Sequence, residues 1–321
     1  MEKLNPYALR QQAGESLQAA AYDPRKLVLI HTAVSLGSSL LAAALSFVLN
    51  QQIAGTGGLS GIGLRSILST IQAVLELAVS VALPFWNISL AYAALQWIRR
   101  EPAEPSSLLQ GFRRFGTVFG ARFFVSAIFM ALAMAAIYIS TTIFLLTPFS
   151  KQLLEVFEPI LQAFDPNAAT MTQEELEALL TPELLTQAAK ASIPMFVLFA
   201  LLFAGFAIPL FYRLRFVDFF VMDGEGVLSS VSQSMRMTRG RSLQVVKLDL
   251  HFWWFYLLQL LTVVLCYGDT LLPLLGIALP FSADVGFFLF YALGCLLQCL
   301  LLWRFQATVS ATFAHAYEAL E

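Results

Sequence analysis

The segment FYRLRFVDFFVMDGEGVLSSVSQSMRMTRGRSLQVVKLDLHFWWFYLL, from Phe211 to Leu258, places a polar, arginine-rich stretch between two apolar runs. Arg213 and Arg215 follow the first run, and a short acidic and glycine-rich loop comes next. Three more arginines surround Gly240, a residue type that commonly ends helices. The segment therefore predicts a basic amphipathic hairpin between two membrane helices.

The composition of the whole chain is that of a membrane protein. Of its 321 residues, 58% are hydrophobic and only 12% are charged, with a mean hydropathy of +0.73. A soluble domain has about 25% charged residues. Continuous apolar runs of about 20 residues, enough to cross a membrane as helices, recur along the chain, whereas strands of a β-barrel would alternate. We expect an all-α polytopic membrane protein with about six transmembrane helices and interfacial amphipathic helices on the cytoplasmic side.

Composition divides the chain into five parts. These are a cytoplasmic amphipathic segment (1–26), spans one to three with a cytoplasmic hairpin at 99–122 (27–147), an acidic extracytoplasmic helical insertion (148–192), spans four to six with a cytoplasmic basic hairpin at 213–249 (193–304), and a cytoplasmic interfacial tail (305–321).

Two of these parts carry finer expectations. In the insertion, TQEELEALL and TPELLTQAA predict short capped helices beginning at Thr172 and Thr181. Span four is then expected over Ile193–Tyr212. In the tail, apolar residues such as Phe313 and Leu320 recur at helical spacing, which predicts a separate helix lying on the membrane surface.

Lysine and arginine positions orient the chain, because cytoplasmic loops are enriched in both. With six spans and the N-terminus inside, 16 of the 19 lysines and arginines are cytoplasmic. We therefore expect a multi-pass protein of the bacterial cytoplasmic membrane with both termini in the cytoplasm.

The two cytoplasmic hairpins resemble each other in sequence. The segment 106–113 (SSLLQGFR) matches 229–236 (SSVSQSMR), and Gly116 and Gly240 follow the two segments. Each has a serine and glutamine spaced as a helix-starting pair, in which side chains satisfy free backbone amides. The expected helix caps are Ser107, Gln110, Ser230 and Gln233. A duplicated unit explains the match, and so does any pair of capped basic helices at a membrane surface.

The stretch YRLRFVDFFVMDGEGVLSSVSQSMRMTRGRSLQVVKLDL resembles a bacterial integral-membrane family called domain of unknown function 975. It is similar also to the related membrane domain of some glycerophosphodiester phosphodiesterases. The resemblance implies a six-span helical protein and no settled activity, since the phosphodiesterase chemistry of those relatives lies in a separate soluble domain. The insertion at 148–192 lies outside the family pattern.

No constellation for catalysis is visible in the sequence. It contains no phosphate-binding loop, dinucleotide fingerprint, nucleophile elbow or zinc-protease motif. His31, His251 and His315 are far apart, and the three cysteines form neither a disulfide framework nor a metal pair. We expect a non-enzyme with no cofactor and no metal. Nucleic acid is not an expected partner, because the arginines lie where lipid headgroups would be.

The basic residues of the two hairpins are the best functional signal. Each basic residue near an anionic leaflet contributes about 1 kcal/mol, and arginine can hold a phosphate through two hydrogen bonds. We expect them to bind anionic membrane lipid or a partner protein, although positive charge in such loops also serves to orient the chain. The expected binding residues are Arg213, Arg215, Arg236, Arg239, Arg241, Lys247, Arg113 and Arg114.

A transporter or exporter component for an amphiphilic substrate is the alternative. Pro84 and Asn87 are expected near the middle of span two, where a polar kink would line a path. A hydrogen bond from Asn87 to another helix is the favoured explanation of the asparagine. The spans carry almost no central ionisable residues, which transport commonly requires.

Overall fold

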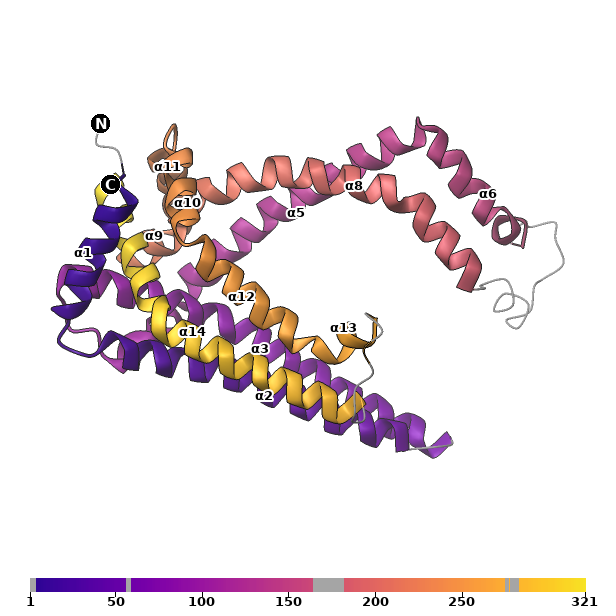
Figure 1. Ribbon diagram of the computed structural model, residues 1–321, viewed down its shortest axis with the longest axis horizontal. Helices are drawn as coiled ribbons and strands as arrows, with labels where there is room; N and C mark the ends of the chain where they lie inside the picture. Colours follow the sequence, from indigo (N-terminus) through magenta and orange to yellow (C-terminus); the bar gives the residue numbers. More distant parts are fainter. Residues whose placement is uncertain (1–3, 56–58, 164–181, 275–276, 278–282) are drawn as a thin grey trace. The chain divides into compact units, whose positions relative to one another are not determined.

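A computed structural model describes residues 4–55, 59–163, 182–274, 277 and 283–321, and this part of the chain is helical with no strand. The elements are α1 (Pro6–Gln18), α2 (Pro24–Gly55), α3 (Leu59–Arg99), η1 (Pro105–Leu109), α4 (Gln110–Arg113), α5 (Phe115–Leu145), α6 (Pro148–Ala163), α8 (Pro182–Arg213), α9 (Val217–Asp223), α10 (Val227–Met237), α11 (Ser242–His251), α12 (Trp253–Cys266), α13 (Gly268–Leu274) and α14 (Ala283–Leu320). The expected all-α class is confirmed (Figure 1).

Within the described residues, five helical stretches are long and apolar enough to cross a membrane: Pro24–Leu45, Ser66–Arg99, Phe115–Leu145, Thr186–Asp223 and Val285–Leu320. A sixth span is counted if α11 and α12, which meet at a bend of 63°, cross together. The chain is a multi-pass helical membrane protein with five to six apolar spans.

The chain forms two compact units, Met1–Arg122 with Tyr212–Glu321, and Phe123–Phe211. The second unit holds most of α5, all of α6 and most of α8. Between α5 and α6, the Ser150 hydroxyl donates to the carbonyl of Thr147 at 2.8 Å and so closes the turn. The two hairpins that are predicted to bind anions lie in the first unit.

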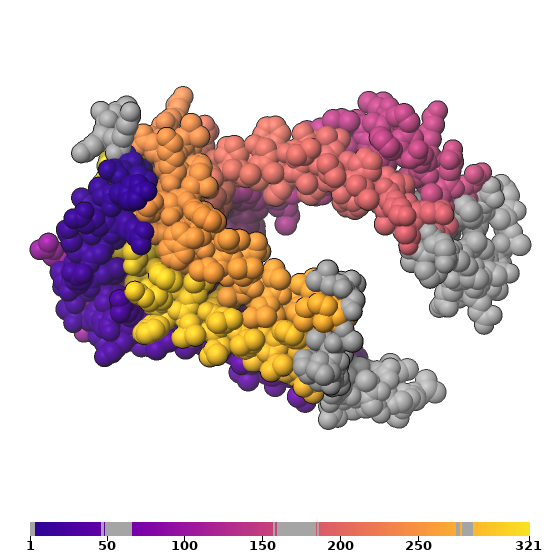
Figure 2. Space-filling view, viewed as in Figure 1, coloured from indigo at the N-terminus to yellow at the C-terminus, as the bar shows by residue number. Residues whose placement is uncertain are grey.

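The core of the first unit is built around α14, which packs against α1, α2, α3 and α12. Figure 2 shows α14 in yellow between α1 and α2 in indigo and α12 in orange. Phe313, Ala314, Ala316 and Tyr317 of α14 are buried, as is Trp97 of α3. The C-terminal end of α14 is therefore part of a protein core.

This burial corrects the prediction of a separate interfacial tail at 305–321. The tail continues α14 without a break because no glycine or proline lies between Trp303 and Glu321. Its apolar face meets α1 and α3 instead of lipid. Helical spacing of apolar residues is the same in both cases, so the spacing alone could not distinguish them.

The expected boundary before span four is also wrong. The segment after Thr181 does not form a short separate helix, because α8 runs continuously from Pro182 to Arg213. Pro194 and Pro209 lie inside α8, and prolines are tolerated in membrane helices when neighbouring groups satisfy the freed backbone atoms. The helix predicted from Thr172 lies in 164–181, outside the described residues.

The predicted helix caps are wrong in both hairpins. Ser230 lies inside α10, where its hydroxyl donates to the carbonyl of Gly226 at 2.8 Å, and Gln233 donates to the Ser229 hydroxyl. Gly226 is the residue that precedes α10, while Glu104 precedes the η1 turn that contains Ser107. A serine bonded one turn back inside a helix has the same sequence spacing as a cap.

Gln110 and Gly116 complete this correction. Gln110 is the first residue of the one-turn helix α4, which has no side-chain cap hydrogen bond. Gly116 lies near the start of α5 and ends no helix. The first hairpin thus has a 3-10 turn and one helical turn where the second has the longer helices α9, α10 and α11.

The matched positions Gly111 and Ser234 nevertheless make comparable contacts. The Gly111 amide donates to Ser89 Oγ of α3 at 2.8 Å, and Ser234 Oγ donates to the carbonyl of Arg213 of α8 at 2.8 Å. Each small residue brings its hairpin close to the helix before it. Small residues at helix contacts allow such close approach of backbones.

We expect Gly111→Ala to destabilise the protein, because the added Cβ would lie 2.0 Å from the Phe85 carbonyl oxygen. Overpacking of this kind costs about 1–3 kcal/mol or more, and the melting temperature in detergent measures it. Gly116→Ala is the matched control, since no atom lies within 4 Å of its added Cβ, and alanine favours a helix by about 0.5–1 kcal/mol. An unchanged melting temperature for Gly111→Ala would contradict the close contact.

Candidate anion-binding site

The basic hairpin is held on the end of α8 by side chains of α10. Ser234 and Thr238 both donate to the carbonyl of Arg213, at 2.8 and 3.2 Å. The last carbonyls of a helix have no partner within it, so these two hydroxyls satisfy a group that would otherwise be left free. Gly240, with φ +74°, then provides the left-handed turn into α11.

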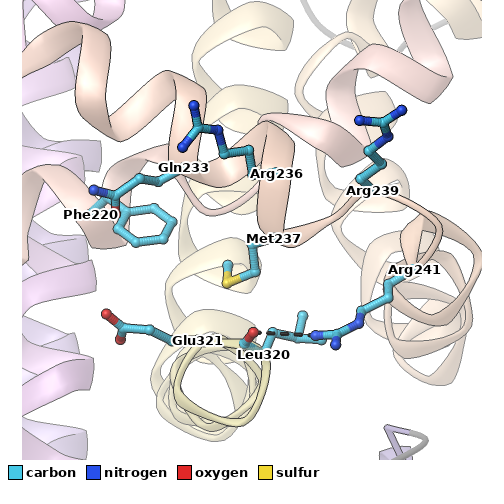
Figure 3. Close-up of a pocket in the computed structure, with 8 residues that line it drawn as sticks. All are labelled: Phe220, Gln233, Arg236, Met237, Arg239, Arg241, Leu320 and Glu321. Atoms are coloured by element: carbon cyan, nitrogen blue, oxygen red, sulfur yellow. Dashed lines mark hydrogen bonds between the residues drawn. The ribbon is translucent and has the colours of Figure 1, made fainter. Parts of the chain in front are cut away.

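This turn presents three of the predicted arginines to one pocket of about 500 Å³. Arg236 lies in the last turn of α10, Arg239 in the connection, and Arg241 directly before α11. Figure 3 shows them around the pocket, with Met237 directed toward the end of α14. The lining residues are Phe220, Gln233, Arg236, Met237, Arg239, Arg241, Leu320 and Glu321.

We call this pocket the basic pocket, because the charges of its lining residues are positive overall. Arg236 and Arg239 are exposed, and in the described part of the chain neither enters an ion pair. Arg241 donates to the carbonyl of Leu320 at 3.2 Å, which ties the pocket to the end of α14. Glu321 brings the one acidic side chain. Guanidinium groups offer a fork of donors that matches the oxygens of phosphate or carboxylate.

Arg215 does not belong to this pocket. Its guanidinium lies 3.3 Å from the carboxylate of Asp249 and 4.5 Å from the ring centre of Phe313. Asp249 is only 8% exposed and also accepts a hydrogen bond from Tyr256 at 2.8 Å. Arg215 therefore already has a counter-charge within the protein, and its role as an anion site stays a prediction.

Arg114 likewise has a partner within the protein. It donates to the carbonyl of Val221 at 3.0 Å, and so joins the first hairpin to α9. Arg113, Arg213 and Lys247 are exposed but do not line the basic pocket. The eight predicted basic residues therefore separate into three that share a pocket and five that do not.

Sequence reasoning missed a charged cluster at the end of α3. Arg99 forms two hydrogen bonds with Asp223, at 2.6 and 2.9 Å, and a third with Glu318 at 2.9 Å. Tyr317 also donates to Asp223 at 3.2 Å. In the neighbouring pair, Arg122 lies 2.7 Å from Asp218. The partners are about a hundred residues or more apart in the chain, so no local spacing could reveal them.

The predicted midplane feature contributes to helix packing. The helix α3 continues through Pro84, and Asn87 accepts a hydrogen bond from Ser35 of α2 at 3.4 Å. Beside it, the Trp86 indole donates to the carbonyl of His31 at 2.9 Å. A polar pair between two membrane helices stabilises their contact. Asn87 is therefore engaged in helix packing, although the transport hypothesis requires its side chain to line a path.

Among the described residues, no three histidine, cysteine, aspartate or glutamate side chains lie close enough together to hold a metal ion. The feature of the basic pocket that suggests a ligand is its positive charge. What this arrangement can do chemically is to hold an anion.

We expect Asp249→Asn to lower the melting temperature, because Arg215 would lose its counter-charge and Tyr256 its charged acceptor. The cost is about 1–3 kcal/mol for a buried, poorly satisfied group, and thermal unfolding in detergent measures it. Lys247→Ala, an exposed change on the same helix, should leave the melting temperature unchanged. Equal melting temperatures for Asp249→Asn and wild type would argue against the network.

Comparisons of the chain with protein families, with curated proteins and with solved structures each found no match. The likeness to domain of unknown function 975 therefore remains a prediction that rests on the residues quoted for it.

Proposed function

We propose that the chain is a non-catalytic membrane protein whose basic pocket binds the headgroup of an anionic lipid at the inner leaflet. One observation carries this proposal. Arg236, Arg239 and Arg241 surround a single pocket, and the first two form no ion pair among the described residues, although Arg99, Arg122 and Arg215 all do. Unpaired guanidinium groups gathered in one place favour an anionic ligand.

Exposed apolar side chains on the two helices that flank the arginines favour a lipid over a soluble anion. Leu228 and Met235 of α10 are exposed, as is Leu243 of α11. Large exposed apolar residues flanking basic ones are typical of helices that lie in the headgroup region. In such a location the leucines would contact acyl chains while the arginines meet phosphate.

The positions of the termini support the orientation that we propose. Helix α1 packs against α14, and Ser16 of α1 lies 3.0 Å from His315 near the end of α14. Adjacent termini agree with an even number of crossings. With six crossings, the lysine and arginine distribution places both termini and the basic pocket on the cytoplasmic side of a bacterial membrane.

We expect the double variant Arg236→Ala with Arg239→Ala to bind phosphatidylglycerol about 30-fold more weakly, at about 1 kcal/mol for each basic residue. Native mass spectrometry of the detergent-purified chain, titrated with this lipid, measures the dissociation constant. Lipids that co-purify with the wild type identify the natural ligand class.

The matched control is Arg113→Ala with Lys247→Ala, which removes the same amount of charge from exposed positions outside the pocket, one in each hairpin. This control should bind phosphatidylglycerol as the wild type does. Equal losses in both double variants would assign the effect to overall charge, and no loss in either would refute the pocket as a lipid site. Protein co-purifying in place of lipid would favour a partner protein instead.

A further inference from the structure

A second pocket, of about 310 Å³, lies where α1, the start of α2 and the C-terminal half of α14 come together. These three helices are neighbours in Figure 1, although their sequences lie at opposite ends of the chain. The volume lies within the range of about 300–1,000 Å³ that is common for ligand pockets. Its lining residues are Gly14, Leu17, Gln18, Asp23, Pro24, Arg25, Arg304, Ala307 and Thr308.

This pocket differs from the basic pocket in its ratio of charges, with two arginines for one carboxylate where the basic pocket has three. Arg25 and Arg304 come from two different helices, and Asp23 provides a carboxylate beside them. Across the described residues, neither arginine forms an ion pair with an acidic side chain. Two cationic groups and one anionic group in one pocket match a ligand that itself carries both charges.

Asp23 is held in place by its role at the start of α2. One oxygen of its carboxylate accepts a hydrogen bond from the Arg25 amide at 3.0 Å, as a helix-capping side chain does. Pro24 follows as the first helical residue, where proline is favoured. The carboxylate therefore has a defined position, and its second oxygen remains available as an acceptor for a donor in the pocket.

The sequence places both arginines at a membrane boundary. After Arg25 and Lys26, no aspartate, glutamate, lysine or arginine occurs before Arg65, and none occurs between Asp284 and Arg304. Because α2 and α14 pack together, the two arginines mark the same end of two adjacent apolar stretches. Phosphate groups of lipids lie at this depth, and arginine side chains extend toward them.

Apolar side chains continue from the pocket along the spans. Leu29 lies one turn beyond Arg25 on α2, and Leu300 lies one turn before Arg304 on α14. Residues four apart share a face of a helix, and these two leucines are 42% and 51% exposed. A lipid with its phosphate at the arginines would have its acyl chains beside them.

We propose that this pocket binds a zwitterionic phospholipid with a primary ammonium group, of the phosphatidylethanolamine class. Arg25 and Arg304 hold the phosphate, and Asp23 accepts a hydrogen bond from the ammonium. An anionic lipid such as phosphatidylglycerol would offer the same phosphate but only neutral hydroxyl donors, with no cationic group to pair with Asp23. Phosphatidylcholine carries the charge but has no N–H donor.

The test is native mass spectrometry of the full chain, titrated separately with phosphatidylethanolamine, phosphatidylcholine and phosphatidylglycerol of the same acyl chains. In the Arg236→Ala with Arg239→Ala background, which removes the proposed phosphatidylglycerol site, the chain should prefer phosphatidylethanolamine by about tenfold, the factor that corresponds to about 1.4 kcal/mol. Arg25→Ala with Arg304→Ala should weaken its binding about 30-fold. Lys26→Ala with Arg100→Ala, two exposed basic residues outside the pocket, should leave binding unchanged.

The variant Asp23→Asn tests the ammonium contact alone. Asparagine caps helices as well as aspartate does, so α2 should remain intact, and thermal unfolding checks this. The preference for phosphatidylethanolamine over phosphatidylcholine should fall to about onefold, while binding of phosphatidylcholine is retained. A preference for phosphatidylglycerol in the Arg236→Ala with Arg239→Ala background, or an Asp23→Asn protein with unaltered preference, would overturn the assignment.

Two further arms distinguish this lipid site from a site for soluble phosphate esters and from the basic pocket. Soluble phosphoethanolamine should compete at least about tenfold more weakly than the lipid because it lacks acyl chains for the apolar stretch; equal competition would refute a lipid site. Arg236→Ala with Arg239→Ala should not alter phosphatidylethanolamine binding, since those residues line the basic pocket. A loss in that variant would refute the independence of the two sites.

Discussion

The bidentate pair between Arg99 and Asp223 is the interaction on which the two arginine-rich hairpins depend. It joins the end of α3 to the end of α9, and α14 adds Glu318 and Tyr317 to the same cluster. Three segments that are far apart in the chain thus meet at one guanidinium. Both side chains are partly exposed, where a single ion pair contributes little, but bidentate geometry and a network of several charges make the contribution larger. This cluster places α9, and with it α10, on the helices that form the core.

Such use of arginine explains why a count of basic residues describes the hairpins poorly. Where a guanidinium lies near a carboxylate, as Arg215 lies near Asp249, their attraction helps to hold helices together. An arginine with no acid beside it, as for Arg236, keeps its full charge for a ligand. Both kinds lie on the same side of the spans and orient the chain equally well. Only the folded arrangement divides them into structural and ligand-binding groups.

Hydropathy was sufficient to predict the helical membrane class and the spans, because long uncharged runs have few other stable solutions in lipid. Local patterns were less reliable at the ends of helices. The spacing of Ser230 and Gln233 suits a cap and also a serine bonded back inside α10, and the apolar spacing near Phe313 suits a lipid surface and also a core. The candidate site was predicted in part: Arg236, Arg239 and Arg241 share a pocket. Arg114 and Arg215 differ from these three arginines because they contact the Val221 carbonyl and Asp249. These contacts form only in the folded chain, so the sequence could not show them.

The two pockets also indicate where specificity can reside in a chain with so few charged residues. A charged side chain at the centre of a span costs about 2.5–3.5 kcal/mol, so a span recognises ligands mainly by shape. At the ends of the spans, where charged side chains reach water and headgroups, this cost disappears. The ratio of basic to acidic side chains can therefore differ from one helix end to the next. The pocket at α10 and α11 has three arginines for one glutamate, and the pocket at α1, α2 and α14 has two arginines for one aspartate that is held by a helix start. If both pockets bind lipid as we propose, their charge ratio and the fixed acceptor would be the features that distinguish two headgroups.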